Sequence, residues 1–120
     1  MRLVAIIAAV LTGTVTAFAS DDIAADFKKA DHQLNATYKA VEERLSDDHP
    51  AKSRLVHAQH AWIAFRDAEC TFQSSGEDGG SVAPTIVALC QTALTEDRTT
   101  QLKAYLNCEE GDLSCPVPSE

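Results

Sequence analysis

The sequence has none of the short motifs that most often mark an enzyme. It contains no Gly-x-Ser-x-Gly elbow, no cysteine and histidine at a catalytic spacing and no glycine-rich phosphate loop. It also has no internal repeat and no alternation of apolar and polar residues that would predict β-strands. Asp and Glu are plentiful, but they fall on polar helix faces, which gives no reason to pair two of them as acid and base. We therefore expect an all-α protein that is not an enzyme and needs no cofactor.

Long apolar runs are also missing beyond the N-terminus. There, Arg2 is followed by LVAIIAAVL and by Ala17-Phe18-Ala19, which is the order of a secretory signal peptide and its cleavage site. The run is too short to span a bilayer as a stable helix. We expect residues 1–19 to be cleaved, residues 20–107 to form a helical domain and residues 108–120 to form a disulfide-closed tail. This predicts a periplasmic or secreted protein with no membrane insertion after cleavage.

Basic residues are scarce. The chain has 10 Lys and Arg against 18 Asp and Glu, a formal net charge of -8. Such a surface repels nucleic acid and anionic membranes, so we expect neither as a partner, whereas a basic protein would be attracted. Charge alone is explained most simply by solubility. The oligomeric state is left open by the sequence.

Metal-binding patterns are absent as well. The cysteines are Cys70, Cys90, Cys108 and Cys115, and none of their spacings is that of a zinc ligand pair. His57 and His60 are three residues apart and could place two imidazoles near one ion, but no third ligand follows at a fixed spacing, so we expect no metal site. An even number of cysteines in an exported chain instead predicts two disulfides.

Apolar residues at helical spacing are what the sequence does have, and they predict three helices. The first is expected from about Ile23 to Leu45, with N-cap candidates at Ser20, Asp21 and Asp22. It should end before Pro50, near which the second helix begins. The apolar stripe of the second helix is assigned to Leu55, Ala58, Trp62, Phe65 and Phe72, and it predicts that Trp62 is mostly buried.

The third helix is expected to begin at Ser81 as N-cap, with Pro84 in its first turn, and to end at Asn107. Helices of similar length with short connections favour a three-helix up-down-up bundle. Cys90 and Cys108 then lie on one helix, too far apart to pair, while Cys70 and Cys90 flank the turn before it at similar depth. The predicted disulfides are Cys70–Cys90 and Cys108–Cys115, which staple a small core.

Polar residues gather on either side of the predicted Cys70–Cys90 bond. Gln59, Trp62 and Arg66 share one face of the second helix. A half-buried guanidinium needs a carboxylate, and we expect Glu69 and Asp97 to accept from Arg66. The interpretation favoured is a structural polar network, and the alternative is a ligand-binding cleft. The network is predicted to comprise Gln59, Trp62, Arg66, Asp67, Glu69, Thr95, Asp97 and Arg98.

These residues carry a resemblance to a known family. The stretch L-x-x-x-Q-x-x-W-x-x-x-R-D-A-E-C, from Leu55 to Cys70, resembles the central signature of the LprI-like family of exported bacterial proteins. Other elements similar in order and spacing are Leu34-Asn35-x-x-Tyr38, Gly79-Gly80-Ser81, Cys90, Leu94-Thr95 and Arg98. The resemblance implies a small, helical, disulfide-bonded envelope domain, in a family named after a lysozyme inhibitor.

Two functions follow as hypotheses. The first is an exported binding protein that inhibits a basic lysozyme-type muramidase, since an acidic surface speeds encounter with a cationic enzyme. The alternative is an envelope structural or interaction domain without an enzyme target, or a small-molecule or metal binder. For the first, we expect the partner to contact the glycine-rich loop between the second and third helices. That loop comprises Gly76, Glu77, Asp78, Gly79, Gly80 and Ser81.

Overall fold

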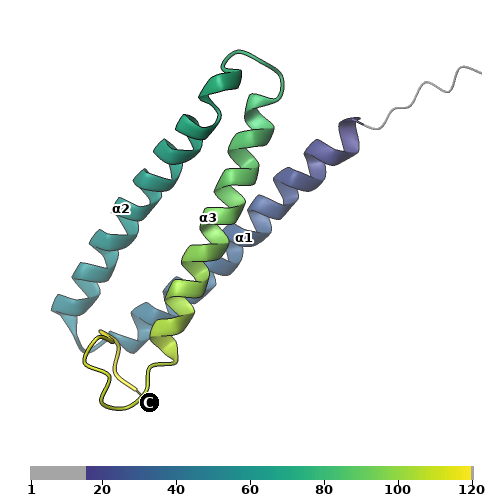
Figure 1. Cartoon of the computed structure of the whole chain (residues 1–120). Coiled ribbons are helices and arrows are strands. Elements are labelled where there is room, and N and C mark those ends of the chain that lie inside the picture. The colour runs from purple at the N-terminus through teal and green to yellow at the C-terminus, as the bar shows by residue number, and fades with distance from the viewer. Residues whose placement is uncertain (1–15, 120) are drawn as a thin grey trace, which may run out of the picture.

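The computed structural model describes residues 16–119, and side chains from Asp21 onward. Residues 1–15 of the predicted signal peptide lie outside the described residues. The described chain forms a three-helix up-down-up bundle of α1 (Thr16–Arg44), α2 (His49–Gln73) and α3 (Ala83–Leu106), with a short 3₁₀ helix, η1 (Ser75–Glu77), after α2 (Figure 1). This confirms the predicted all-α bundle. None of the helices in this part of the chain is long and apolar enough to cross a membrane.

Helix α1 begins earlier than the sequence pattern indicated. It starts at Thr16 rather than near Ile23, so the expected N-cap candidates Ser20, Asp21 and Asp22 lie inside the helix. No proline or glycine separates Thr16 from Ile23, so nothing in the local sequence stops the helix there. Its end at Arg44 agrees with the prediction to within one residue.

The starts of the other two helices are set by different residues. The side chain of Asp48 caps α2 by accepting a hydrogen bond of 2.9 Å from the amide of Ala51. Ser81, the expected cap of α3, lies in a turn instead, and the capping position is Val82 with no side-chain hydrogen bond. Two turns, closed by hydrogen bonds from Gly80 to Glu77 and from Ala83 to Gly80, carry the chain past Ser81 before the helix begins.

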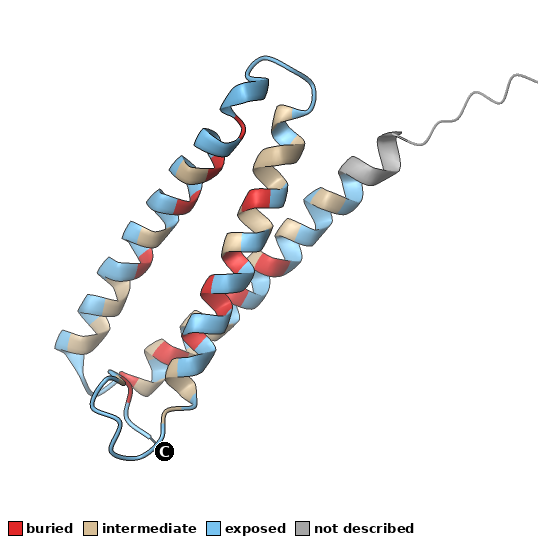
Figure 2. Cartoon of the chain, viewed as in Figure 1, coloured by how far each residue is buried: buried red, intermediate tan, exposed pale blue. Residues whose placement is uncertain are grey.

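The apolar core lies mainly between α1 and α3, and α3 packs against both other helices. Its buried members are Leu34 and Val41 from α1, Leu45 just after that helix, Leu102 from α3, and Val117 from the C-terminal tail. Figure 2 shows the buried residues along the facing sides of the helices. The buried residues of α2 are Gln59, Arg66 and Cys70, so this helix faces the bundle largely with polar groups.

The predicted apolar stripe of α2 is therefore wrong in part. Trp62 is partly buried and packs against the core, in agreement with the prediction, but Phe65 and Phe72 are 55% and 72% exposed. The reason is helical rotation: Cys70 faces α3, and at 100° per residue Phe65 and Phe72 point about 140° or more away from it. The stripe is real, but most of it lies on the outer face of the bundle.

The C-terminal tail packs on the end of the bundle. Its turn is closed by the predicted Cys108–Cys115 disulfide, with Cα atoms 6.1 Å apart. Asp112 accepts hydrogen bonds from the hydroxyl and the amide of Ser114, at 2.6 and 2.9 Å, and these lower the pKa of its carboxyl below the usual value. Val117 then enters the core between α1 and α3. The tail thus completes the hydrophobic core.

Candidate functional site

The predicted Cys70–Cys90 disulfide is present and fixes the α2–α3 hairpin, with 5.5 Å between the two Cα atoms. Both cysteines are buried. Below this bond, away from the connecting loop, the polar faces of α2 and α3 meet. The disulfide therefore determines which residues of the two helices form the seam between them.

Arg66 lies at the centre of this seam and reaches all three helices. Its Nε donates to Asp67 Oδ1 at 2.9 Å, and its Nη1 donates to the hydroxyl of Thr95 on α3 at 3.4 Å. On α1, Asp31 Oδ1 lies 3.8 Å from Nη1. A single buried guanidinium thus fixes the relative positions of three helices.

Aromatic rings cover the same guanidinium. The Arg66 Cζ lies 5.5 Å from the ring centre of Phe27 on α1 and 5.3 Å from that of Trp62 on α2. Such cation–π contacts are worth roughly 0.5–2 kcal/mol, more where water is excluded. The contact with Trp62 gives a physical reason for the position of Arg66 one turn after the tryptophan on α2.

The carboxylates that contact Arg66 are not the two predicted from the sequence. Asp67 and Asp31 contact it, rather than Glu69 and Asp97. Glu69 accepts a hydrogen bond from Gln73 one turn along α2 at 3.1 Å, and Asp97 is exposed. Since Thr95 faces the seam, a residue two positions later is turned about 200° away from it, which takes Asp97 to the outer face of α3.

A second pair lies further from the loop. Arg98 donates from Nε to Gln59 Oε1 at 3.0 Å and from Nη1 to Gln101 Oε1 at 3.1 Å, and both Gln59 and Arg98 are buried. Within the described residues, no buried side-chain nitrogen or oxygen atom lacks a hydrogen-bond partner. A network whose polar atoms all have partners is well suited to fixing helix register.

The loop proposed as a contact surface stands clear of the bundle. All residues of the loop, Gly76 to Ser81, are exposed at the end of the α2–α3 hairpin (Figure 2). Gly79 has φ +77°, a backbone conformation that residues with a side chain rarely adopt. At the base of the loop, the hydroxyl of buried Ser74 donates to the carbonyl of Thr71 at 3.0 Å. The base of the loop is thus held by a hydrogen bond, and its tip is exposed to solvent.

The half of the hairpin nearest the loop has charges of one sign only. We call residues 67–97 the acidic hairpin, because the chain has no lysine, arginine or histidine between Arg66 and Arg98. This segment also exposes three large apolar side chains, namely Phe72, Val82 and Leu89. The apolar residues were missed as surface features, although the run without basic residues is visible in the sequence.

The histidines considered as metal ligands are not part of this surface. His57 and His60 are both exposed on α2. Among the residues that the structure describes, no three His, Cys, Asp or Glu side chains are grouped closely enough to hold a metal ion.

Comparisons with known proteins match most of the chain. Residues 12–102 match the protein family described as lysozyme inhibitor LprI. Over 96 residues the chain is 34% identical to an uncharacterized protein of Rhizobium meliloti (strain 1021), an alignment that covers 71% of this chain and 69% of that protein. No solved structure is significantly similar.

Proposed function

The chain belongs to the lysozyme inhibitor LprI family, and on that premise we propose that it is an exported protein that inhibits a lysozyme-type muramidase. The contact surface is the acidic hairpin, with the Gly76–Ser81 loop at its centre. The observation that carries this assignment is the uninterrupted negative charge of residues 67–97 within a family of inhibitors.

Charge supports the choice of partner. Glu77 and Asp78 are exposed at the tip, and no basic side chain of the same segment neutralises them. Lysozyme-type enzymes of basic character would be steered toward such a surface, with faster association at low ionic strength. Nucleic acid and anionic membranes would be repelled by the same field.

Exposed apolar residues supply the apolar contact area that charged residues alone do not. Protein interfaces combine a desolvated apolar centre, often aromatic, with a polar rim. Phe72, Val82 and Leu89 give the acidic hairpin apolar area beside its carboxylates. The Cys70–Cys90 bond holds both sides of the loop, so less conformational freedom is lost on binding than with a free loop.

The location follows from the same premise. Two disulfides are typical of proteins that fold in an oxidising compartment, which is the periplasm or the exterior of a bacterium. We propose that the protein acts there as a binding protein rather than as an enzyme. An inhibitor of an exogenous muramidase needs no catalytic group of its own.

Charge reversal at the loop tests the contact surface. The double variant Glu77→Lys/Asp78→Lys should raise the inhibition constant for a cationic lysozyme by about tenfold or more, since it places like charges at the interface. The matched control is Glu109→Lys/Glu110→Lys, which makes the same charge change on exposed residues of the tail. The measurement is residual lysis of bacterial cell walls against inhibitor concentration.

The control separates local from general electrostatics. Both variants should keep the wild-type melting temperature within a few degrees, because all four positions are exposed. Equal losses of inhibition in the two variants would show that only net charge matters and would contradict the assignment of the loop as the contact surface.

A further inference from the structure

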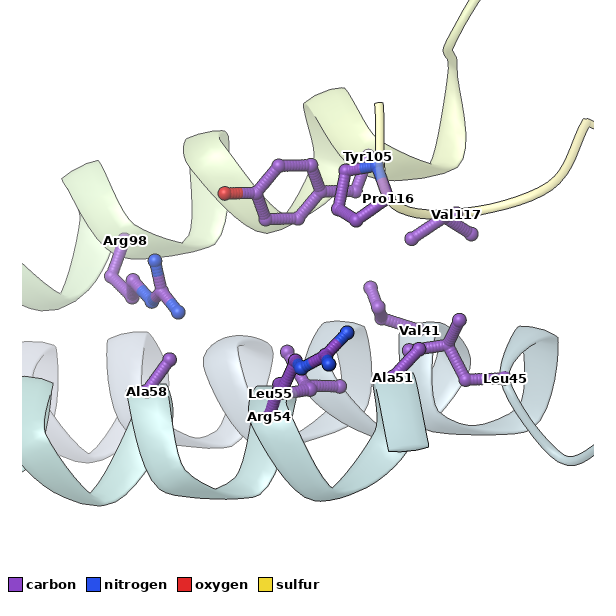
Figure 3. Close-up of a pocket in the computed structure, with 10 residues that line it drawn as sticks. All are labelled: Val41, Leu45, Ala51, Arg54, Leu55, Ala58, Arg98, Tyr105, Pro116 and Val117. Atoms are coloured by element: carbon purple, nitrogen blue, oxygen red, sulfur yellow. The ribbon is translucent and has the colours of Figure 1, made fainter. Parts of the chain in front are cut away.

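A cavity lies at the opposite end of the bundle from the Gly76–Ser81 loop. It has a volume of about 250 Å³, is partly open to solvent, and is lined by the C-terminal part of α1, the first half of α2, α3 and the tail (Figure 3). An apolar cavity of about 150 Å³ already holds benzene. The space is therefore sufficient for a small organic molecule.

The two ends of the cavity differ in chemistry. Val41 and Val117 line one end, and Arg98 lies at the other, with Leu55 and Arg54 between them on α2 (Figure 3). In the same view, the ring of Tyr105 extends along the wall with its hydroxyl oxygen toward the Arg98 end. A molecule that fits this space needs an apolar tail and a head group that arginine binds.

The contacts of Arg98 leave its positive charge without a negatively charged partner. Its side chain lines the cavity, the residue is 9% exposed, and its hydrogen-bond partners are the neutral amide oxygens of Gln59 and Gln101. Among the described residues, no carboxylate forms a salt bridge with Arg98 or with Arg54. Burying a guanidinium without an anion beside it costs folding free energy. The chain has 18 acidic residues, yet none of those described is paired with Arg98.

We propose that this cavity binds a monocarboxylate with a short apolar tail. The carboxylate accepts from the guanidinium of Arg98, whose planar donors match carboxylate oxygens, and Arg54 supplies a second positive charge in the same lining. The Tyr105 hydroxyl is a further donor on the same side. The tail extends toward Val41 and Val117, where its burial adds roughly 0.8 kcal/mol per methylene group.

The positive charge of the lining disfavours other classes of ligand. A cationic amphiphile would face two guanidinium groups, and a neutral one would leave Arg98 without an anion. The cavity lies at the opposite end of the bundle from the Gly76–Ser81 loop, and its existence does not depend on inhibition of lysozyme.

Calorimetric titration of the full chain with three eight-carbon probes tests the proposal. Octanoate should bind with one-to-one stoichiometry, octan-1-ol at least about tenfold more weakly, and octylammonium not measurably, because only the first has the charge that the arginines bind. Amide chemical shifts of isotope-labelled protein should move at Leu55, Arg98 and Val117 when octanoate is added.

Variants identify the residues responsible. Arg54→Met, at an exposed position that should not affect folding, is expected to weaken octanoate binding by about tenfold. Lys103→Met, an exposed position on α3 that does not line the cavity, should leave it unchanged. Arg98→Met should abolish preference for octanoate over octan-1-ol. The proposal is overturned if octanoate shows no saturable binding, or if the three probes bind equally.

Discussion

Leu102→Ala should lower the free energy of unfolding by about 3 kcal/mol, which is typical of leucine truncation in a packed core. Leu102 has no exposed surface and lies in the core cluster with Leu34 and Val41 of α1 and Val117 of the tail. Removing it opens a cavity where three parts of the chain meet. For a domain of this size the melting temperature should fall by roughly 12–24 °C.

Leu89→Ala is the matched control for this experiment. It makes the same truncation on the same helix, but Leu89 is 53% exposed, so we expect a change within about 0.5 kcal/mol. Urea unfolding followed by circular dichroism measures both. Similar losses for the two variants would contradict the placement of the core between α1 and α3.

Removal of the Cys70–Cys90 bond should cost about 3 kcal/mol. In the chain-entropy model, a bond across 20 residues restricts the unfolded chain by about that amount. The double variant Cys70→Ala/Cys90→Ala should also weaken inhibition of lysozyme, because the base of the Gly76–Ser81 loop is no longer held. Stability and inhibition would then fall together.

The other disulfide provides the comparison. Cys108→Ala/Cys115→Ala removes a bond across 7 residues and should cost about 2 kcal/mol, with inhibition retained, because the tail is at the other end of the bundle. Unfolding in denaturant and the lysis assay give the two readouts. Loss of inhibition in the tail variant alone would show that the contact surface had been assigned to the wrong end.

The polar seam fixes register more than it adds stability. The carboxylates that hold Arg66 belong to Asp31 and Asp67, whose side chains are 44% and 52% exposed. Ion pairs with partners so accessible to water contribute little, about 0–1 kcal/mol each. What the seam does supply is a common contact for α1, α2 and α3, which restricts how the helices slide past one another.

Local features of the fold were predictable from the sequence, and long-range ones were not. Helical periodicity, the proline near the start of α2 and the glycine-rich loop locate the helices, and the cysteine positions then allow one sensible pairing. The sequence could not predict which side of α2 faces the bundle. Its polar side, with Gln59 and Arg66, turns inward, while Phe65 and Phe72 face outward.

Contacts between distant segments carried no sequence signal. Asp31 approaches Arg66 from another helix, and nothing in the pattern of α1 distinguishes it from the other acidic residues of that helix. Val117 enters the core from a tail without periodicity. For the candidate site, the exposed acidic loop was predictable from its composition, whereas the apolar residues beside it depend on the packing of the hairpin.

The most direct test of the proposed function is titration of a cationic lysozyme with the purified wild-type protein at low and at moderate salt, with binding followed by calorimetry and residual muramidase activity measured on the same mixtures. We predict saturable binding that parallels loss of activity, with weaker affinity at the higher salt, since charge attraction contributes to the complex. Absence of both binding and inhibition at low salt and high protein concentration would contradict the account.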